Sequence, residues 1–162
     1  MKEGSVQRTH PPSFDELPLL RWWLDWHRDA LLLSCEGLTD SQLRSRPVPP
    51  SHLSLLGLVR HMTLLERIYW RRAFLGDETV FIPEGDEADF DGVEHVDPAA
   101  AFEAWRTERS FADEILDSRP LETRGVGGQT VRFWVLKLIS EYSRHNGHAD
   151  ILREVIDGTV GE

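Results

Sequence analysis

The chain has 162 residues, of which 40% are hydrophobic and 28% charged, a balance typical of one soluble globular domain. Its formal net charge of −10 argues against a nucleic-acid partner and against docking on an anionic membrane, since both need a basic face. The single cysteine excludes a disulfide framework within the chain, and no apolar run nears the ~20 residues of a membrane span, so we expect a cytoplasmic protein.

The N-terminal part of the chain predicts a polar lead followed by a helix. Residues 1–12 are expected to be a flexible lead, and residues 13–162 to form one domain. Ser13, with Glu16 three residues later, has the pattern of a helix N-cap. Apolar residues at helical spacing then predict a first helix from about residue 15 to residue 36.

A proline-rich loop separates this helix from the next one. Residues 38–50 contain three prolines and predict a fixed loop with a short turn at 39–43. A second helix is predicted from a cap at Ser51 or Ser54 to about Leu75. Its apolar residues fall on one stripe, formed by Leu55, Leu58, Met62, Leu65 and Tyr69.

A long acidic connection follows the second helix. Residues 76–97 are rich in Asp, Glu and Gly and show little helical periodicity, so we expect a connection that either covers a functional site or lies in solvent. Asp97 followed by Pro98 predicts the start of a third helix, which ends before Pro120.

The last part of the chain predicts a turn and a fourth helix. Glycines within 125–128 mark the turn, with a weak signal for two short strands around it, and the fourth helix is expected from about residue 130 to residue 157. Four long amphipathic segments predict an all-α fold. We expect a four-helix bundle with one long crossover connection between its second and third helices.

Three polar side chains of the fourth helix suit a metal ion. On a helical wheel at ~100° per residue, His145 falls near the centre of the apolar face, with Glu141 and His148 on its flank. Buried carboxylates and imidazoles need partners, and one metal ion would satisfy them together. The alternative is a hydrogen-bonded polar network in the core.

The second helix offers complementary groups. His61 lies at the edge of its apolar stripe and Glu66 lies within the stripe. A His from one helix and a Glu/His pair from another would make a three-ligand site with one position open for water or substrate. Each residue also has a structural interpretation: His61 as a core histidine, and Glu66 as a salt-bridged or outer-sphere carboxylate.

Two stretches carry a family resemblance. They are LSLLGLVRHMTLLERIYW at 53–70 and SEYSRHNGHADILREVIDG at 140–158. They resemble the DinB/YfiT-like metalloenzyme superfamily, and within it the actinobacterial branch of DinB-like proteins, over about residues 14–158. The resemblance implies a four-helix bundle whose metal is held by a His on the second helix and two ligands one turn apart on the fourth.

The fourth-helix pattern of this superfamily often reads H-x-x-x-H-R-G-Q, and Gly147 sets the register here. Glu141 then stands where the first His is expected, as in the similar mycothiol-dependent maleylpyruvate isomerases. The resemblance therefore implies His61, Glu141 and His145 as metal ligands, with His148 facing the substrate, in the outer sphere, or as a fourth ligand. Mixed nitrogen and oxygen ligation suits zinc, with nickel, iron or manganese as alternatives.

Relatives of this type are thiol-dependent transferases or isomerases that use mycothiol or bacillithiol, and they are often homodimers. The resemblance implies transfer of a low-molecular-weight thiol, mycothiol, to a small electrophile, with Glu66 or His148 as the catalytic group that moves protons. The alternatives are a metal-dependent hydrolase and a non-catalytic metal-binding or structural dimeric bundle.

Overall fold

The computed structural model describes residues 10–82 and 90–161, so most of the predicted N-terminal lead lies outside the described residues. Within these ranges the regular structure is helical and no strand is formed, which confirms the predicted all-α class. The elements are α1 (Glu16–Cys35), α2 (Asp40–Arg44), α3 (Leu55–Arg67), the π-helix η1 (Ile68–Phe74), the 3-10 helix η2 (Val93–His95), α4 (Pro98–Ser118) and α5 (Val131–Asp157).

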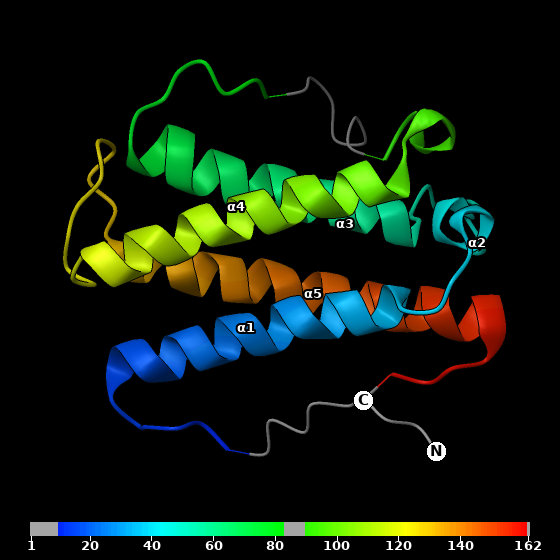
Figure 1. Cartoon of the computed structure of the whole chain (residues 1–162), viewed down its shortest axis with the longest axis horizontal. Coiled ribbons are helices and arrows are strands. Elements are labelled where there is room, and N and C mark those ends of the chain that lie inside the picture. The colour runs from blue at the N-terminus through cyan, green and yellow to red at the C-terminus, as the bar shows by residue number, and fades with distance from the viewer. Residues whose placement is uncertain (1–9, 83–89, 162) are drawn as a thin grey trace.

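The long helices α1, α3 with its continuation η1, α4 and α5 lie side by side along the long axis of the molecule (Figure 1). α1 and α5 run in one direction and pack against each other, while α3 and α4 run in the opposite direction and also form a pair. Because α3 and α4 are parallel, the connection between them has to return along the whole length of the molecule (Figure 1). The two pairs meet mainly where α3 contacts α5.

Side-chain caps begin several of the helices. Thr39 and Gln42 form a complete capping box at α2, so the turn expected at 39–43 is a short helix. The Ser54 hydroxyl accepts a hydrogen bond from the Gly57 N–H at the start of α3. The prediction of Ser13 as a cap is wrong: its hydroxyl accepts from the Asp15 N–H in a local turn, and Asp15 is the N-cap residue of α1.

The C-terminal part of the predicted second helix is a π-helix rather than an α-helix. In η1 the Leu75 N–H donates to the carbonyl of Trp70, five residues back, at 3.1 Å. This wider turn directs both Trp70 and Phe74 into the core, where they are 0% and 2% exposed. π-helical turns are rare and often lie at functional sites, and helical periodicity alone does not predict them.

The glycine turn before α5 packs against the end of η1. The predicted strand pair is reduced to a single antiparallel bridge between Arg124 and Thr130. The Val126 N–H donates to the Phe74 carbonyl at 3.0 Å. A Cβ at Gly125 would lie 2.5 Å from that same carbonyl oxygen, so only glycine allows this close approach.

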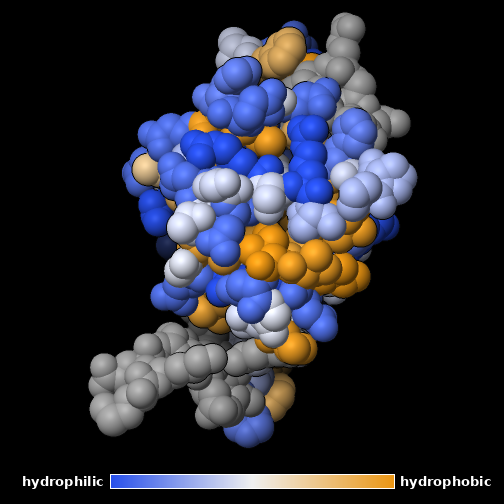
Figure 2. Space-filling view, turned by 90° about the vertical axis from the view of Figure 1, so that its right-hand side faces the viewer, coloured by the Kyte–Doolittle hydropathy of each residue, from blue (hydrophilic) through white to orange (hydrophobic). Residues whose placement is uncertain are grey.

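Apolar side chains fill the interior and also reach the surface. The predicted apolar stripe of the second helix is largely in the core, with Leu55, Leu58 and Met62 fully buried. Figure 2 shows the end of the molecule that lies on the right in Figure 1, where a patch of apolar residues is exposed between hydrophilic ones. On α5, Ile151 and Val155 lie one turn apart and are each 56% exposed. Within the described ranges, the helices are too short or too polar to cross a membrane.

Candidate functional site

The seam between α3 and α5 brings together four of the five predicted site residues. The rings of His61 on α3 and His145 on α5 are nearly perpendicular, with centroids 4.6 Å apart. His145 Nε2 lies 3.8 Å from Glu141 Oε2, and His145 Nδ1 lies 3.4 Å from His148 Nδ1. All four side chains are partly buried. Residues more than 70 positions apart in the chain therefore form one polar cluster.

Glu141 is the most heavily contacted carboxylate of this cluster. Lys137, one turn earlier on α5, pairs with Glu141 Oε1 at 2.5 Å, and the Tyr69 hydroxyl lies 3.5 Å from the same oxygen. Burial opposes ionisation of Glu141, but the hydrogen bond and charge of Lys137 outweigh it and lower the Glu141 pKa. Burial together with this carboxylate raises the pKa of Tyr69 to about 12. Glu141 is therefore an anion and Tyr69 a neutral phenol near neutral pH.

His145 is held in its neutral form. Its burial, reinforced by the neighbouring His61 and His148, lowers the pKa of His145 to about 4, although Glu141 partly opposes this shift. A neutral imidazole has a lone pair available for a metal ion or a proton, which a protonated one lacks.

The donor set of this cluster fits a divalent cation in its chemistry. Two ligands of one zinc ion, each about 2.0–2.2 Å from it, stand roughly 3–3.5 Å apart, close to the separation of His145 Nε2 and Glu141 Oε2. Across residues 10–82 and 90–161, however, no group of three or more His, Cys, Asp or Glu side chains is arranged to hold an ion. Binding would therefore require these side chains to reorient, including the Glu141 carboxylate that Lys137 contacts.

Glu66 lies in a different environment from the other four residues. It is fully buried, and Arg28 of α1 contacts its Oε1 with both Nε and Nη2, at 2.9 and 2.8 Å. The Tyr142 hydroxyl donates to the same oxygen at 3.1 Å. Burial raises the pKa of Glu66, and the Arg28 charge opposes that rise. These contacts agree with the salt-bridged interpretation of Glu66.

The acidic connection covers part of the site. Phe90 is buried, and its ring stacks on His61 with centroids 5.4 Å apart. The Arg60 guanidinium donates to the Asp91 carbonyl at 2.7 Å, and Arg46 donates to the Phe90 carbonyl at the same distance. The segment that begins at Phe90 thus shields the imidazole of His61 from solvent on one side.

Residues beyond the five predicted ones also shape the site. The sequence pattern predicts Tyr69 only as part of an apolar stripe. Lys137 lies four residues before Glu141, a spacing at which opposite charges pair on a helix, so the sequence did carry this signal. Tyr142 is fully buried and Asn146 nearly so, which moves the centre of the buried face of α5 away from His145. A helical wheel places His145 at the centre because it treats a tyrosine hydroxyl and an amide as surface groups.

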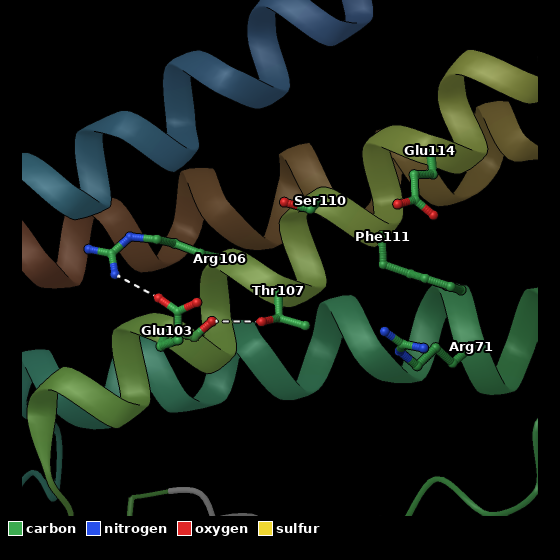
Figure 3. A pocket seen from close by; sticks show the side chains of 7 residues that line it. All are labelled: Arg71, Glu103, Arg106, Thr107, Ser110, Phe111 and Glu114. Atoms are coloured by element: carbon green, nitrogen blue, oxygen red, sulfur yellow. Dashed lines mark hydrogen bonds and ion pairs between the residues drawn. The ribbon is translucent and has the colours of Figure 1, made fainter.

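The described part of the chain has two hollows worth comparing, and none of the five predicted residues lines either of them. The first, of about 340 Å³, lies along α4 and η1 (Figure 3). Its charged side chains already have partners. Arg106 pairs with Glu103 at 3.4 Å. The Arg71 guanidinium lies 3.7 Å from the centre of the Phe111 ring and also pairs with Glu108. The second, of about 480 Å³, lies between η1 and the glycine turn.

Comparison with known proteins gives one positive result. A protein-family model described as Mycothiol-S-transferase matches residues 19–158, which includes α1 from its first turn, the whole polar cluster and α5 to its end. Neither the comparison with curated proteins nor the comparison with solved structures found a match.

Proposed function

The chain belongs to the Mycothiol-S-transferase family, as the resemblance to DinB-like proteins predicted, and from this premise we propose that it transfers mycothiol to a small electrophile. We place the reaction at a divalent metal ion, zinc in the first instance, held by His61, Glu141 and His145. The observation that carries this assignment is the pairing of a neutral His145 with an ionised Glu141 beside the ring of His61.

The nucleophile of this reaction comes from the co-substrate. Cys35 is the only cysteine of the chain, and burial raises the pKa of its thiol to about 12, so it is neither exposed nor ionised near neutral pH. A bound metal ion would lower the pKa of a thiol that enters its open coordination position. The residues of the seam then have to orient the thiol, exclude water and accept its proton.

The transfer step requires a proton acceptor and a leaving group. The sulfur lone pair forms a C–S bond with the electrophilic carbon, the bond to the leaving group breaks, and the leaving group departs with its electron pair. The thiol proton goes to His148, which contacts His145 and is partly open to solvent. Glu66 is the alternative acceptor, but its ion pair with Arg28 and its complete burial favour a structural role.

We further propose the setting in which the site operates. The arrangement of α1, α3, α4 and α5 supports a single-domain four-helix bundle over residues 13–162, with one crossover between α3 and α4.

The exposed Ile151 and Val155 support a homodimer formed through α5, since apolar residues gathered on one face often mark an interface. Sedimentation equilibrium tests the dimer, and a monomer at micromolar concentration would refute it. The cytoplasm, where thiols stay reduced, suits a thiol-dependent enzyme.

The test uses purified protein prepared without chelators. We expect stoichiometric zinc in the wild type and in His95→Ala, whose side chain is exposed outside the seam, and loss of the metal in His145→Ala. With mycothiol and monochlorobimane, the metal-loaded protein should form the bimane conjugate much faster than the chelated protein. Because a bound metal ion would lower the pKa of the coordinated thiol, a chelated protein that conjugates as fast as the metal-loaded one would contradict the proposal.

Two results would redirect the assignment. If neither wild type nor His145→Ala contains metal, the metal-dependent reactions lose their site and a non-catalytic bundle becomes the better explanation. If the metal-loaded protein hydrolyses esters or amides at a rate that does not depend on thiol, the hydrolase alternative replaces the transferase.

A further inference from the structure

The hollow between η1 and the glycine turn borders α5, the helix that carries Glu141 and His145. Trp134 forms part of its wall and lies seven residues, or two helical turns, before Glu141 on α5. The Trp134 ring packs against Tyr69 at 5.0 Å, and the Tyr69 hydroxyl reaches Glu141 at 3.5 Å. One aromatic contact and one hydrogen bond therefore connect the wall of the hollow to the polar cluster.

The walls of the hollow are mainly apolar. Ile68, Ala73, Ile82, Val126 and Trp134 contribute to them. Val126 is 72% exposed and Ile82 45% exposed, so folding leaves these side chains in contact with water at the hollow's edge. A concave surface of a few hundred Å³ with apolar walls is the usual form of a site for a small organic molecule.

The polar groups around the hollow argue against an anionic ligand. Nη1 of Arg72 donates to the carbonyls of Glu78 and Val80, at 3.1 and 2.9 Å, which holds this guanidinium against the backbone. Glu78 adds a negative charge at the rim. The indole N–H of Trp134, in the wall of the hollow, is buried and has no hydrogen-bond partner among the described residues. An uncharged molecule with a hydrogen-bond acceptor would suit these groups.

Backbone hydrogen bonds fix the glycine turn that forms one side of the hollow. The Gly125 N–H donates to the Gln129 carbonyl at 2.9 Å, and the Gly128 N–H donates to the Gly125 carbonyl at 2.9 Å, which fixes the glycine turn. The Val126 N–H ties that turn to Phe74 at the end of η1. A site already formed in the free protein loses less conformational entropy on binding.

We propose that this hollow binds the apolar, non-reacting part of the electrophile, which orients its reactive carbon toward the His61/Glu141/His145 cluster. The inference rests on the proposed transferase function. Mycothiol fits the hollow poorly, because a sugar-based thiol carries many hydroxyl groups that would lose hydrogen bonds with water against apolar walls. The hollow therefore determines which electrophiles react, and we expect uncharged, apolar ones to be preferred over carboxylates.

The test places a charge in the hollow with a matched control. Val126→Asp introduces a carboxylate at the hollow, and Val160→Asp makes the same change at a residue that is 71% exposed and does not line it. Two measurements are made: the KM values for monochlorobimane and for mycothiol, and the binding of an unreactive methylbimane, in which hydrogen replaces chlorine, to the metal-free protein by equilibrium dialysis.

We expect Val126→Asp to raise both the Kd for methylbimane and the KM for monochlorobimane by about tenfold, because that is the effect of losing a small apolar contact. The KM for mycothiol should stay unchanged. Val160→Asp should change none of the three. Equal probe affinity in both variants would overturn the inference, as would a rise in the KM for mycothiol alone. If conjugation fails in every protein while Val126→Asp still weakens probe binding, the hollow stands as a ligand site and only the transferase proposal falls.

Discussion

At the scale of single residues, the state of the Glu141 carboxylate decides how well the polar cluster can hold a metal ion. Oε1 pairs with Lys137 while Oε2 faces His145 Nε2. The ammonium keeps Glu141 ionised, which a metal ligand requires, but it also occupies one oxygen and places a positive charge beside the cation. These two effects oppose each other, and a substitution at Lys137 separates them.

We expect Lys137→Met to increase zinc affinity about two- to fivefold, because the loss of a partly exposed ion pair, worth roughly 0.2–1 kcal/mol, frees the carboxylate and removes the repulsion. Competition with a chromogenic zinc chelator measures the change. Lys137→Arg keeps the charge and should bind zinc as the wild type does. A weaker zinc affinity in Lys137→Met would show instead that the lysine is needed to keep Glu141 ionised.

At the scale of helices, a buried polar network joins all four long segments. Arg28 of α1 contacts Glu66 of α3 and, at 3.0 Å, Asp113 of α4. Tyr142 of α5 donates to Glu66 and accepts from the Trp105 indole of α4 at 2.8 Å. Tyr142 directly follows Glu141, so this network fixes the rotation of α5 from which the proposed ligands project.

We expect Glu66→Leu to lower the free energy of unfolding by about 3–5 kcal/mol, because it leaves the buried Arg28 without its closest partner. Asp25 and Asp113 still contact Arg28, which favours the lower end of that range. The double variant Arg28→Met/Glu66→Leu removes both charges and should recover most of the loss. Urea unfolding of the metal-free proteins measures both values, and an unfolding free energy no higher in the double variant than in Glu66→Leu would contradict this account.

Glu66→Gln separates the structural role from the proton-transfer role. The amide keeps the shape and can still accept hydrogen bonds from Arg28 and Tyr142, but it cannot accept a proton from a thiol. If Glu66 is structural, this variant should conjugate mycothiol at close to the wild-type rate, while His148→Gln should be slow.

The sequence predicted the elements better than it predicted their contacts. Helical periodicity identified all four long segments because apolar burial repeats with every turn. It also placed Glu141, His145 and His148 on one side of the fourth helix, and His61 at the edge of the second helix's apolar stripe. Periodicity could not predict the π-helical turn at Ile68–Phe74, which depends on a local change in hydrogen bonding. It also could not predict the Arg28–Glu66 pair, because the two residues meet only through packing of helices distant in sequence.

At the scale of the whole molecule, the polar cluster lies where the two helix pairs meet. α3 packs with α4, α5 packs with α1, and His61 and His145 face each other across the contact between α3 and α5. A metal ion shared by these residues would bind only when both pairs are docked. Its binding energy would therefore add to the stability of the whole fold by mass action.

Removal of the metal should accordingly lower the melting temperature of the wild type. At a free zinc concentration 100 times the Kd, the bound ion contributes about 2.7 kcal/mol, which corresponds to a fall of roughly 5–10 °C on chelation for a domain of this size. In His61→Ala the chelator should change the melting temperature by less than half as much, because the link between α3 and α5 is lost. His95→Ala, whose side chain is exposed on η2, should respond like the wild type. Differential scanning calorimetry with and without chelator measures the three shifts, and equal shifts in all three proteins would exclude His61 from the metal site.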